Sequence, residues 1–215
     1  MLSQPFVLRC LTASVLALPL LSWAGRPQVV DDAGVNDTGH GHVEVWWTHG
    51  PSGVRGFTAA PAYAPLDGVE LSVAHNRDLA GRDHSWLAQA KIQITPSQEE
   101  GCNFAVALGQ LHVYQQGSTS LVNGLMSCNR GPWSLHANLG GLRAPASPLA
   151  RTWGLGLEHR WDSWTLILEA FGQRHTQPTL QLGARTWLTP AWQLDASVGA
   201  QGGRGVATLG VKYQF

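Results

Sequence analysis

The stretch Ala191-Trp192-Gln193-Leu194-Asp195-Ala196-Ser197-Val198-Gly199-Ala200-Gln201 alternates apolar and polar residues with a period of two. Such a run is typical of a β-strand, because successive side chains of an extended chain point to opposite faces. One face of this strand is therefore apolar and the other is polar. The last eleven residues, 205–215, show the same alternation and end on Phe215.

The same pattern recurs along most of the chain and predicts a series of short strands. Pro61 and Pro65 weaken the second of them because each removes a ladder donor, so ten strands is the alternative to twelve. An even number of strands returns both termini to the same side of a barrel. The expected strands are 42–48, 57–64, 69–76, 85–94, 102–114, 119–128, 133–142, 151–161, 164–173, 179–188, 191–201 and 205–215.

Alternation alone suits both a membrane β-barrel and a soluble β-sandwich. The turns and the positions of particular side chains must therefore decide between these two folds. Turns as short as Asp162-Ser163 and Thr189-Pro190 connect the strands in a meander without long crossovers. Tryptophans such as Trp133 lie at strand ends, as in the aromatic girdles of membrane barrels. The sequence therefore predicts an all-β fold, a transmembrane antiparallel up-and-down β-barrel.

Charged side chains on the polar faces also favour a barrel, because a solvated lumen tolerates them and a dry sandwich core does not. We expect opposite charges to pair across neighbouring strands, with Arg185 meeting Glu169 across a turn near Thr176. The residues expected to line the lumen are Glu44, Glu70, Lys91, Glu158, Arg160, Glu169, Arg185, Asp195 and Lys212.

The composition excludes several classes of protein. The 215 residues carry 14 basic and 14 acidic side chains, so the net charge of zero gives no indication of a nucleic-acid partner. Charged residues make up 13% and hydrophobic residues 44%, a mixture that fits neither disorder nor an ordinary cytosolic domain. No apolar run after residue 24 is long enough for a transmembrane helix, so a helical membrane protein is excluded.

The first 24 residues have the pattern of a secretory signal peptide. Arg9 supplies the positive charge, residues 10–21 form the apolar stretch, and residues 22–24 present small side chains where a signal peptidase cuts. We expect three parts: a signal peptide at 1–24, a periplasmic N-terminal segment at 25–41 and an outer-membrane β-barrel at 42–215.

Cys102 and Cys128 are the two cysteines left after removal of this signal peptide. Opposed residues of a hairpin are equidistant from its turn, and these two are centred on Gln115, where the strand pattern independently predicts a turn. They should face each other at the periplasmic end of one hairpin and form a disulfide in an oxidising compartment. A redox switch is the less favoured alternative.

The expected mature N-terminus resembles a known family. Residues 25–34, GRPQVVDDAG, and the following Gly41-His42-Val43-Glu44 resemble the opening of bacterial outer-membrane proteins of the MetA-pathway-of-phenol-degradation-like family. The meander and the terminal phenylalanine are similar to that family along the mature chain, whereas the specific match is limited to these residues. The resemblance implies an outer-membrane channel or transporter, in some members linked to uptake of aromatic compounds.

Two short motifs contain residue types that other proteins use for chemistry. His40 and His42 offer two metal ligands but no evident third, so we assign no metal and no cofactor. Asp83, His84 and Ser85 are the residue types of a hydrolase, but neighbours on a strand point to opposite faces and no Gly-x-Ser-x-Gly motif is present. We expect no enzyme, and an outer-leaflet hydrolase is the least favoured alternative.

Charge is distributed unevenly between the two ends of the expected barrel. The loops far from the termini carry an excess of arginine, whereas the near side is acidic. Guanidinium groups bind phosphate with paired hydrogen bonds, so we expect this rim to contact lipopolysaccharide and other outer-membrane lipid. The expected outer-rim residues are Arg55, Arg77, Arg82, Arg143, Arg151, Arg174 and Arg204.

These features predict a narrow outer-membrane channel or transporter for small solutes, with aromatic compounds as one class. A structural or lipid-interacting barrel with a plugged lumen is the alternative, since twelve strands lie between the filled eight-stranded barrels and the open sixteen-stranded porins. The expected partners are outer-membrane lipid, small solutes and the barrel-assembly machinery that inserts such proteins. No nucleic acid is expected.

Overall fold

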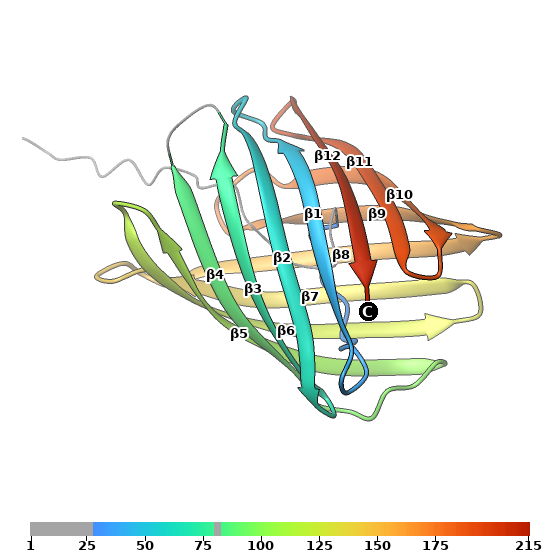
Figure 1. Ribbon diagram of the computed structural model, residues 1–215. Coiled ribbons are helices and arrows are strands. Elements are labelled where there is room, and N and C mark those ends of the chain that lie inside the picture. Colours follow the sequence, from blue (N-terminus) through green and yellow to red (C-terminus); the bar gives the residue numbers. More distant parts are fainter. Residues whose placement is uncertain (1–27, 80–82) are drawn as a thin grey trace, which may run out of the picture.

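Consecutive strands pair in antiparallel fashion throughout the computed structural model, which describes residues 28–79 and 83–215. Strand β1 also pairs with β12, so the sheet closes into a barrel (Figure 1). The predicted signal peptide and Arg82 lie outside the described residues. The strands are β1 (Gly41–His49), β2 (Arg55–Leu66), β3 (Val69–Asp78), β4 (His84–Gln93), β5 (Gly101–Val113), β6 (Gly117–Arg130), β7 (Trp133–Arg143), β8 (Ala150–Trp161), β9 (Trp164–Gln173), β10 (Thr179–Thr189), β11 (Trp192–Gln201) and β12 (Arg204–Gln214).

The seam between the first and last strands is held by reciprocal backbone hydrogen bonds. The Gly41 N–H donates to the Phe215 carbonyl, and the Phe215 N–H donates to the Gly41 carbonyl, each at 2.9 Å. Closure leaves no free sheet edge in the described barrel. The predicted up-and-down barrel of twelve strands is confirmed, and the alternative of ten strands is wrong. Within the described residues, the structure contains no helix long and apolar enough to span a membrane.

The proline-containing strand β2 is complete despite its missing donors. It extends two residues further at each end than the predicted 57–64. Pro61 faces Val43 of β1, and the register with β3 shifts around Pro65. A local irregularity of this kind accommodates the lost hydrogen bond without ending the strand.

The two faces of the wall differ in polarity, as the alternation predicts. Outward-facing side chains such as Leu182, Val198 and Leu209 are 57%, 63% and 53% exposed, and this is the face expected to contact lipid. Inward-facing Glu169 and Asp195 are 2% and 1% exposed. The inward face of the wall therefore includes buried charged side chains.

Arginine at Leu209 should destabilise the inserted barrel by about 2 to 4 kcal/mol, because it places a charge on the lipid-facing wall. Thr208 is the matched position on the inward face, and Thr208→Arg should cost less. Denaturant titration of barrels refolded in lipid vesicles measures both costs. Equal losses for the two variants would contradict the assignment of the faces.

The two cysteines fix the register of one hairpin. Cys102 of β5 lies opposite Cys128 of β6, and the two form a disulfide, as predicted. The turn between these strands lies at residues 114–116, around the predicted centre. The bond joins the ends of β5 and β6 on the side of the barrel where β1 begins and β12 ends.

Candidate functional site: a lumen filled by the N-terminal segment

Residues 28–36 lie inside the barrel, and we call them the N-terminal plug. Gln28, Val30, Asp31 and Ala33 are buried, although these residues belong to no strand. The expected periplasmic segment at 25–41 therefore turns back into the lumen over much of its described part, which corrects the prediction. Alternation carries no signal for such a segment, because an irregular chain has no period of two.

Glu169 of β9 anchors the start of the plug. Its carboxylate accepts hydrogen bonds from the backbone N–H groups of Val29 at 3.0 Å and Val30 at 2.8 Å. The side-chain amide of Gln181 on β10 donates to the same carboxylate. Hydrogen bonds to an ionised acceptor are stronger than neutral ones. These bonds hold the plug against β9 and β10.

The nearby strands β6 and β7 bind the plug through neutral polar side chains. Asn138 of β7 accepts from the Asp31 N–H at 2.7 Å and donates to the Asp31 carbonyl at 2.8 Å. Ser127 of β6 accepts from the Ala33 N–H at 2.8 Å. The buried backbone groups of an irregular segment thus find partners in the wall, as buried polar groups must.

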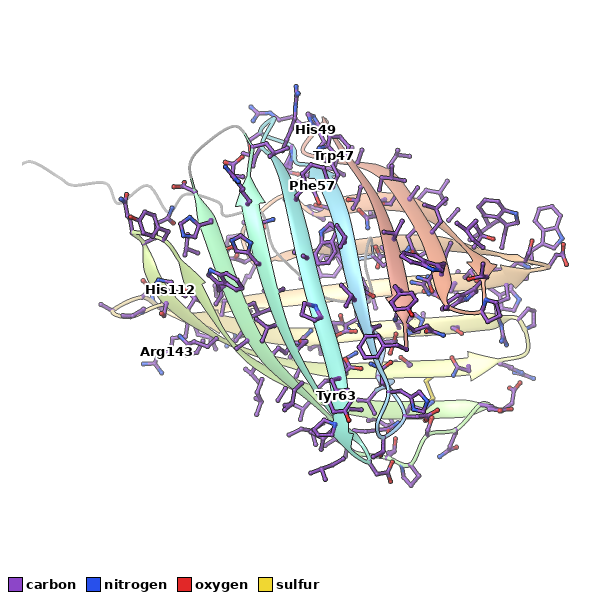
Figure 2. The ribbon with its side chains drawn as sticks, viewed as in Figure 1. Trp47, His49, Phe57, Tyr63, His112 and Arg143 are labelled. Atoms are coloured by element: carbon purple, nitrogen blue, oxygen red, sulfur yellow. A yellow bond between two sulfur atoms is a disulfide. The ribbon has the colours of Figure 1, made fainter. Side chains whose placement is uncertain are left out.

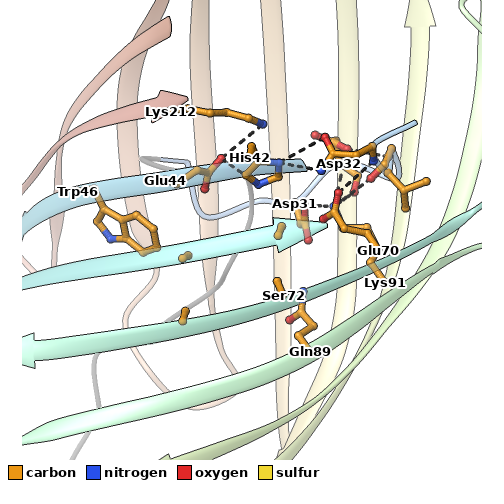
Figure 3. A pocket seen from close by; sticks show the side chains of 16 residues that line it. Asp31, Asp32, His42, Glu44, Trp46, Glu70, Ser72, Gln89, Lys91 and Lys212 are labelled. Carbon is orange, nitrogen blue, oxygen red and sulfur yellow. Dashed lines mark hydrogen bonds and ion pairs between the residues drawn. The ribbon is translucent and has the colours of Figure 1, made fainter. Parts of the chain in front are cut away.

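Lys91 of β4 binds the middle of the plug (Figure 3). Its ammonium group lies 2.8 Å from the Asp31 carboxylate and donates to the carbonyl oxygens of Asp32 at 3.3 Å and Gly34 at 3.1 Å. Lys91 and Asp31 are both buried, so the Asp31 carboxylate depends on Lys91 for charge compensation, and the Lys91 ammonium also lies 3.9 Å from the Asp32 carboxylate. Burial raises the pKa of Asp31, and the Lys91 ammonium opposes this rise.

Small wall residues make room for the plug. A Cβ added at Gly156 of β8 would lie 3.4 Å from the Cβ of Val30, and one at Gly154 would lie 2.9 Å from a Val30 methyl carbon. Val29 and Val30 also pack against Phe171. The glycines of β8 are therefore explained by the close approach of another chain segment.

Arg185 of β10 is the centre of a second charged cluster. Its guanidinium lies 2.9 Å from Asp195 and 3.5 Å from Glu158, and it donates to the Gln28 side chain of the plug at 2.7 Å. The predicted pairing of Arg185 with Glu169 is wrong. In the observed register Arg185 faces Thr165 of β9, four residues along that strand from Glu169.

The predicted lumen residues separate into two groups by position. Arg160 is exposed at the end of β8, where its Nη2 donates to the Gly131 carbonyl at 2.8 Å. The others are buried or half-buried on inward-facing positions: Glu44, Glu70, Lys91, Glu158, Glu169, Arg185, Asp195 and Lys212. The described rim arginines are exposed at the end of the barrel away from the termini: Arg55, Arg77, Arg143, Arg151, Arg174 and Arg204.

A cavity of about 210 Å³ remains between the plug and the wall formed by β12 and β1 to β4 (Figure 3). Within its lining, Lys212 lies 3.5 Å from Glu44, and the Asn36 amide lies 2.9 Å from the His42 ring. The Asn36 N–H also donates to Glu70 at 3.0 Å. The cavity therefore presents donors and acceptors of both charges and has room for several water molecules.

Sequence reasoning missed the apolar part of the lumen. Trp46 is 2% exposed and packs with Ala60, Ala74 and Leu87. The dipeptide Trp46-Trp47 could have predicted an apolar residue in the lumen. Neighbours on a strand face opposite ways, so one of the two tryptophans must point inward. This cluster narrows the lumen beside the cavity.

The hydrolase-like residues His84 and Ser85 lie on opposite faces of the barrel wall. His84 stacks on Tyr114 with ring centroids 4.6 Å apart on the outer face, whereas Ser85 is buried on the inner face. The two side chains therefore do not act on one substrate atom. Among the residues 28–79 and 83–215, no group of three or more His, Cys, Asp or Glu side chains is placed to hold a metal ion.

Residues 14–208 match the model of a family described as "Uncharacterised conserved protein UCP029691". The chain belongs to this family. No curated protein matches this member of the UCP029691 family. The resemblance of its N-terminus to the phenol-degradation-pathway family stays a prediction.

Solved porin structures share the fold of this UCP029691 member. A KdgM porin superposes with a TM-score of 0.69 at 11% identity, over 81% of this chain and 99% of that chain. A second structure, "KdgM porin in complex with disordered oligogalacturonate", gives a TM-score of 0.69 at 10% identity, over 82% and 99%. A NanC porin gives 0.63 at 8% identity, over 80% and 98%. At these identities the likeness establishes the porin-type barrel fold.

Proposed function

We propose that the chain is an outer-membrane channel for small solutes, closed in this structure by its own N-terminal plug. The porin-type fold supports a channel, and the observation that carries the proposal is the occupation of the lumen by residues 28–36. The plug is joined to β1 by residues 37–40 and shares no strand ladder with the wall. It can therefore leave the lumen without unfolding the barrel.

The contacts of the plug suit reversible docking. Most of its hydrogen bonds are to polar side chains of the wall, and water replaces such bonds at a net cost of about 0.5 to 1.5 kcal/mol each. The apolar contacts of Val29, Val30 and Phe171 favour the second candidate, a structural barrel with a permanent plug. This cluster is small, which is why we favour a channel.

The charges of the emptied lumen favour cations and neutral solutes over polyanions. The inward-facing wall has more carboxylates than cationic groups. The carboxylates of Asp31 and Asp32 belong to the plug and leave the lumen with it, but the wall alone stays acidic. One similar porin is solved with oligogalacturonate, whereas we propose that this lumen selects against such a polyanion. The wall residues are the basic Lys91, Arg185 and Lys212 and the acidic Glu44, Glu70, Glu158, Glu169 and Asp195.

A reversible covalent lock tests whether the plug gates the channel. The positions of Val30 and Gly156 suit a disulfide, because a Cβ at residue 156 would lie 3.4 Å from that of residue 30. We expect Val30→Cys/Gly156→Cys to show no openings in planar bilayers when oxidised and to conduct after reduction. The wild-type chain in the same reductant is the control, since Cys102 and Cys128 are reduced as well.

Openings that continue in the oxidised double variant would contradict gating by the plug. Wild-type barrels that never open, at any voltage or after reduction, would favour the permanently plugged barrel. Liposome swelling measures solute uptake by the same preparations. A comparison of a neutral sugar with an aromatic acid tests the uptake of aromatic compounds that the family resemblance implies.

Arg185→Ala should shift ion selectivity towards cations and increase conductance, because it removes a positive charge from the lumen and a hydrogen bond to Gln28 of the plug. Arg160→Ala is the matched control, since Arg160 is exposed outside the narrow part of the lumen. Reversal potentials in a salt gradient measure the selectivity. An equal shift in both variants, or none in either, would remove Arg185 from the conduction path.

A further inference from the structure

The outer face of the barrel carries a cluster of basic side chains at the loop end of β3 to β7. We call His75, Arg77, His84, His112 and Arg143 the outer basic patch. Strand pairing places them in adjacent rows. Arg77 faces His84 across β3 and β4, and one row runs from His75 through Trp86 of β4 to His112 of β5.

Ring stacking and hydrogen bonding hold the imidazoles of the patch in place. The His75 ring stacks on Trp86 with centroids 4.2 Å apart, and the His84 ring stacks on Tyr114 at 4.6 Å. His112 Nδ1 lies 3.0 Å from the Ser118 hydroxyl. A ligand that binds these rings therefore meets groups that are already ordered, which lowers the entropic cost of binding.

The guanidinium groups of the patch are exposed and lack a carboxylate partner within the described part of the chain. Arg77 and Arg143 take part in none of the ion pairs between residues 28–79 and 83–215. His112 and Arg143 both project from the outer surface of the wall in Figure 2. The patch therefore presents uncompensated positive charge on the side of the barrel that should face lipid.

Neighbouring aromatic residues indicate the depth of the patch in the membrane. Trp86 and Tyr114 lie within its rows, and Trp47 and Phe57 lie at the same end of the barrel (Figure 2). Tryptophan and tyrosine collect at the level of the lipid headgroups. Arginine at this depth meets headgroups rather than hydrocarbon.

The patch is confined to one side of the barrel. Within β9 to β12 the outward-facing residues near the loops include the apolar Ala170, Leu180, Ala200 and Ala207. The arginines of that side, Arg174 and Arg204, lie after the end of β9 and at the first residue of β12, and no histidine stands beside them within these strands. A general attraction to anionic lipid would not require such asymmetry. The contrast indicates a localised site.

We propose that the outer basic patch binds the phosphorylated headgroup of a lipopolysaccharide molecule in the outer leaflet. Neighbouring strands are about 4.8 Å apart, so the four intervals from β3 to β7 span roughly 19 Å. This width suits a headgroup with more than one phosphate better than a single phosphate. Arginine binds each phosphate with paired, charge-assisted hydrogen bonds. The site lies outside the lumen and does not depend on the channel function.

Native mass spectrometry of the folded barrel in detergent micelles doped with diphosphoryl lipid A tests the site. We expect one tightly retained lipid, and an affinity about tenfold lower for Arg77→Gln/Arg143→Gln because two charge-assisted contacts are lost. Arg151→Gln/Arg174→Gln removes the same charge from rim residues of the β8–β9 side and should change the affinity less than about twofold. Heat-modifiable migration on gels shows that each variant is folded.

Competing probes distinguish the source of the phosphate. Dephosphorylated lipid A and phosphatidylglycerol should bind more weakly than the diphosphoryl lipid, and inorganic phosphate should not displace it at millimolar concentration. An equal loss of affinity for diphosphoryl lipid A in the two double variants would overturn a localised site. Equal binding of phosphatidylglycerol, or displacement by inorganic phosphate, would overturn a site for a headgroup with several phosphates.

Discussion

Deletion of residues 28–36 should raise the mean conductance of the channel by about 100-fold. One or two charge-assisted hydrogen bonds, such as those from Val29 and Val30 to Glu169, are worth about 3 kcal/mol in total. A docking free energy of that size leaves an open fraction of about 1%, which deletion converts to a permanently open state. Planar-bilayer recordings at matched protein concentration measure the change.

The control for the deletion replaces the same nine residues with a Gly-Ser repeat of equal length. This variant keeps the distance to β1 and the backbone N–H groups that bind Glu169, but it removes every side chain of the plug, including Asp31. Its conductance should therefore lie between those of the wild type and the deletion. If both variants stay as closed as the wild type while they migrate as folded barrels, the apolar cluster around Trp46 rather than the plug closes the lumen.

Lys91→Met should also open the channel, because it leaves Asp31 buried without its counter-ion. The loss of one partner of a buried ion pair costs about 3 to 5 kcal/mol, which exceeds the docking free energy estimated above. The barrel wall should remain intact, since the lost contacts are made to the plug. Hydrogen exchange should show faster exchange of the backbone amides of residues 29–36, in parallel with increased conductance.

The variant Lys91→Met/Asp31→Asn removes both charges and should restore much of the docking. The difference between the single and double variants isolates the pairwise interaction. Lys91→Arg, which keeps the charge, should resemble the wild type. A double variant as open as Lys91→Met would show that the contacts from Lys91 to the carbonyl oxygens of Asp32 and Gly34, rather than the ion pair, hold the plug.

The wall of the barrel was predictable because alternation is a local property of the chain. Ala191 to Gln201 shows its two faces without knowledge of any neighbouring strand, and the structure orients Leu194 and Asp195 accordingly. The disulfide was predictable for the same reason, since the position of one turn sets the partners on both sides of it. Pro61 does not interrupt β2, because the strand stays paired with β1 on both sides of the proline, which lies opposite Val43.

The content of the lumen was not predictable in this way. The plug has no period, and its partners lie on strands far along the chain, so no local pattern distinguishes a segment inside the barrel from one outside. The error over Arg185 has a different cause. A misplaced turn between β9 and β10 shifted the expected register, and Arg185 meets Asp195 on the next strand instead of Glu169.

The distance along the chain between the plug and its anchors orders the steps of assembly. Val29 lies 140 residues before Glu169, its hydrogen-bond partner. Contacts of such long range form late in folding, because the loop between them must first be organised. The first described residues to be synthesised are therefore among the last to reach their final place, after the hairpins have joined and β1 has met β12. If the barrel is a channel, we expect a newly inserted barrel to conduct until the plug enters the lumen.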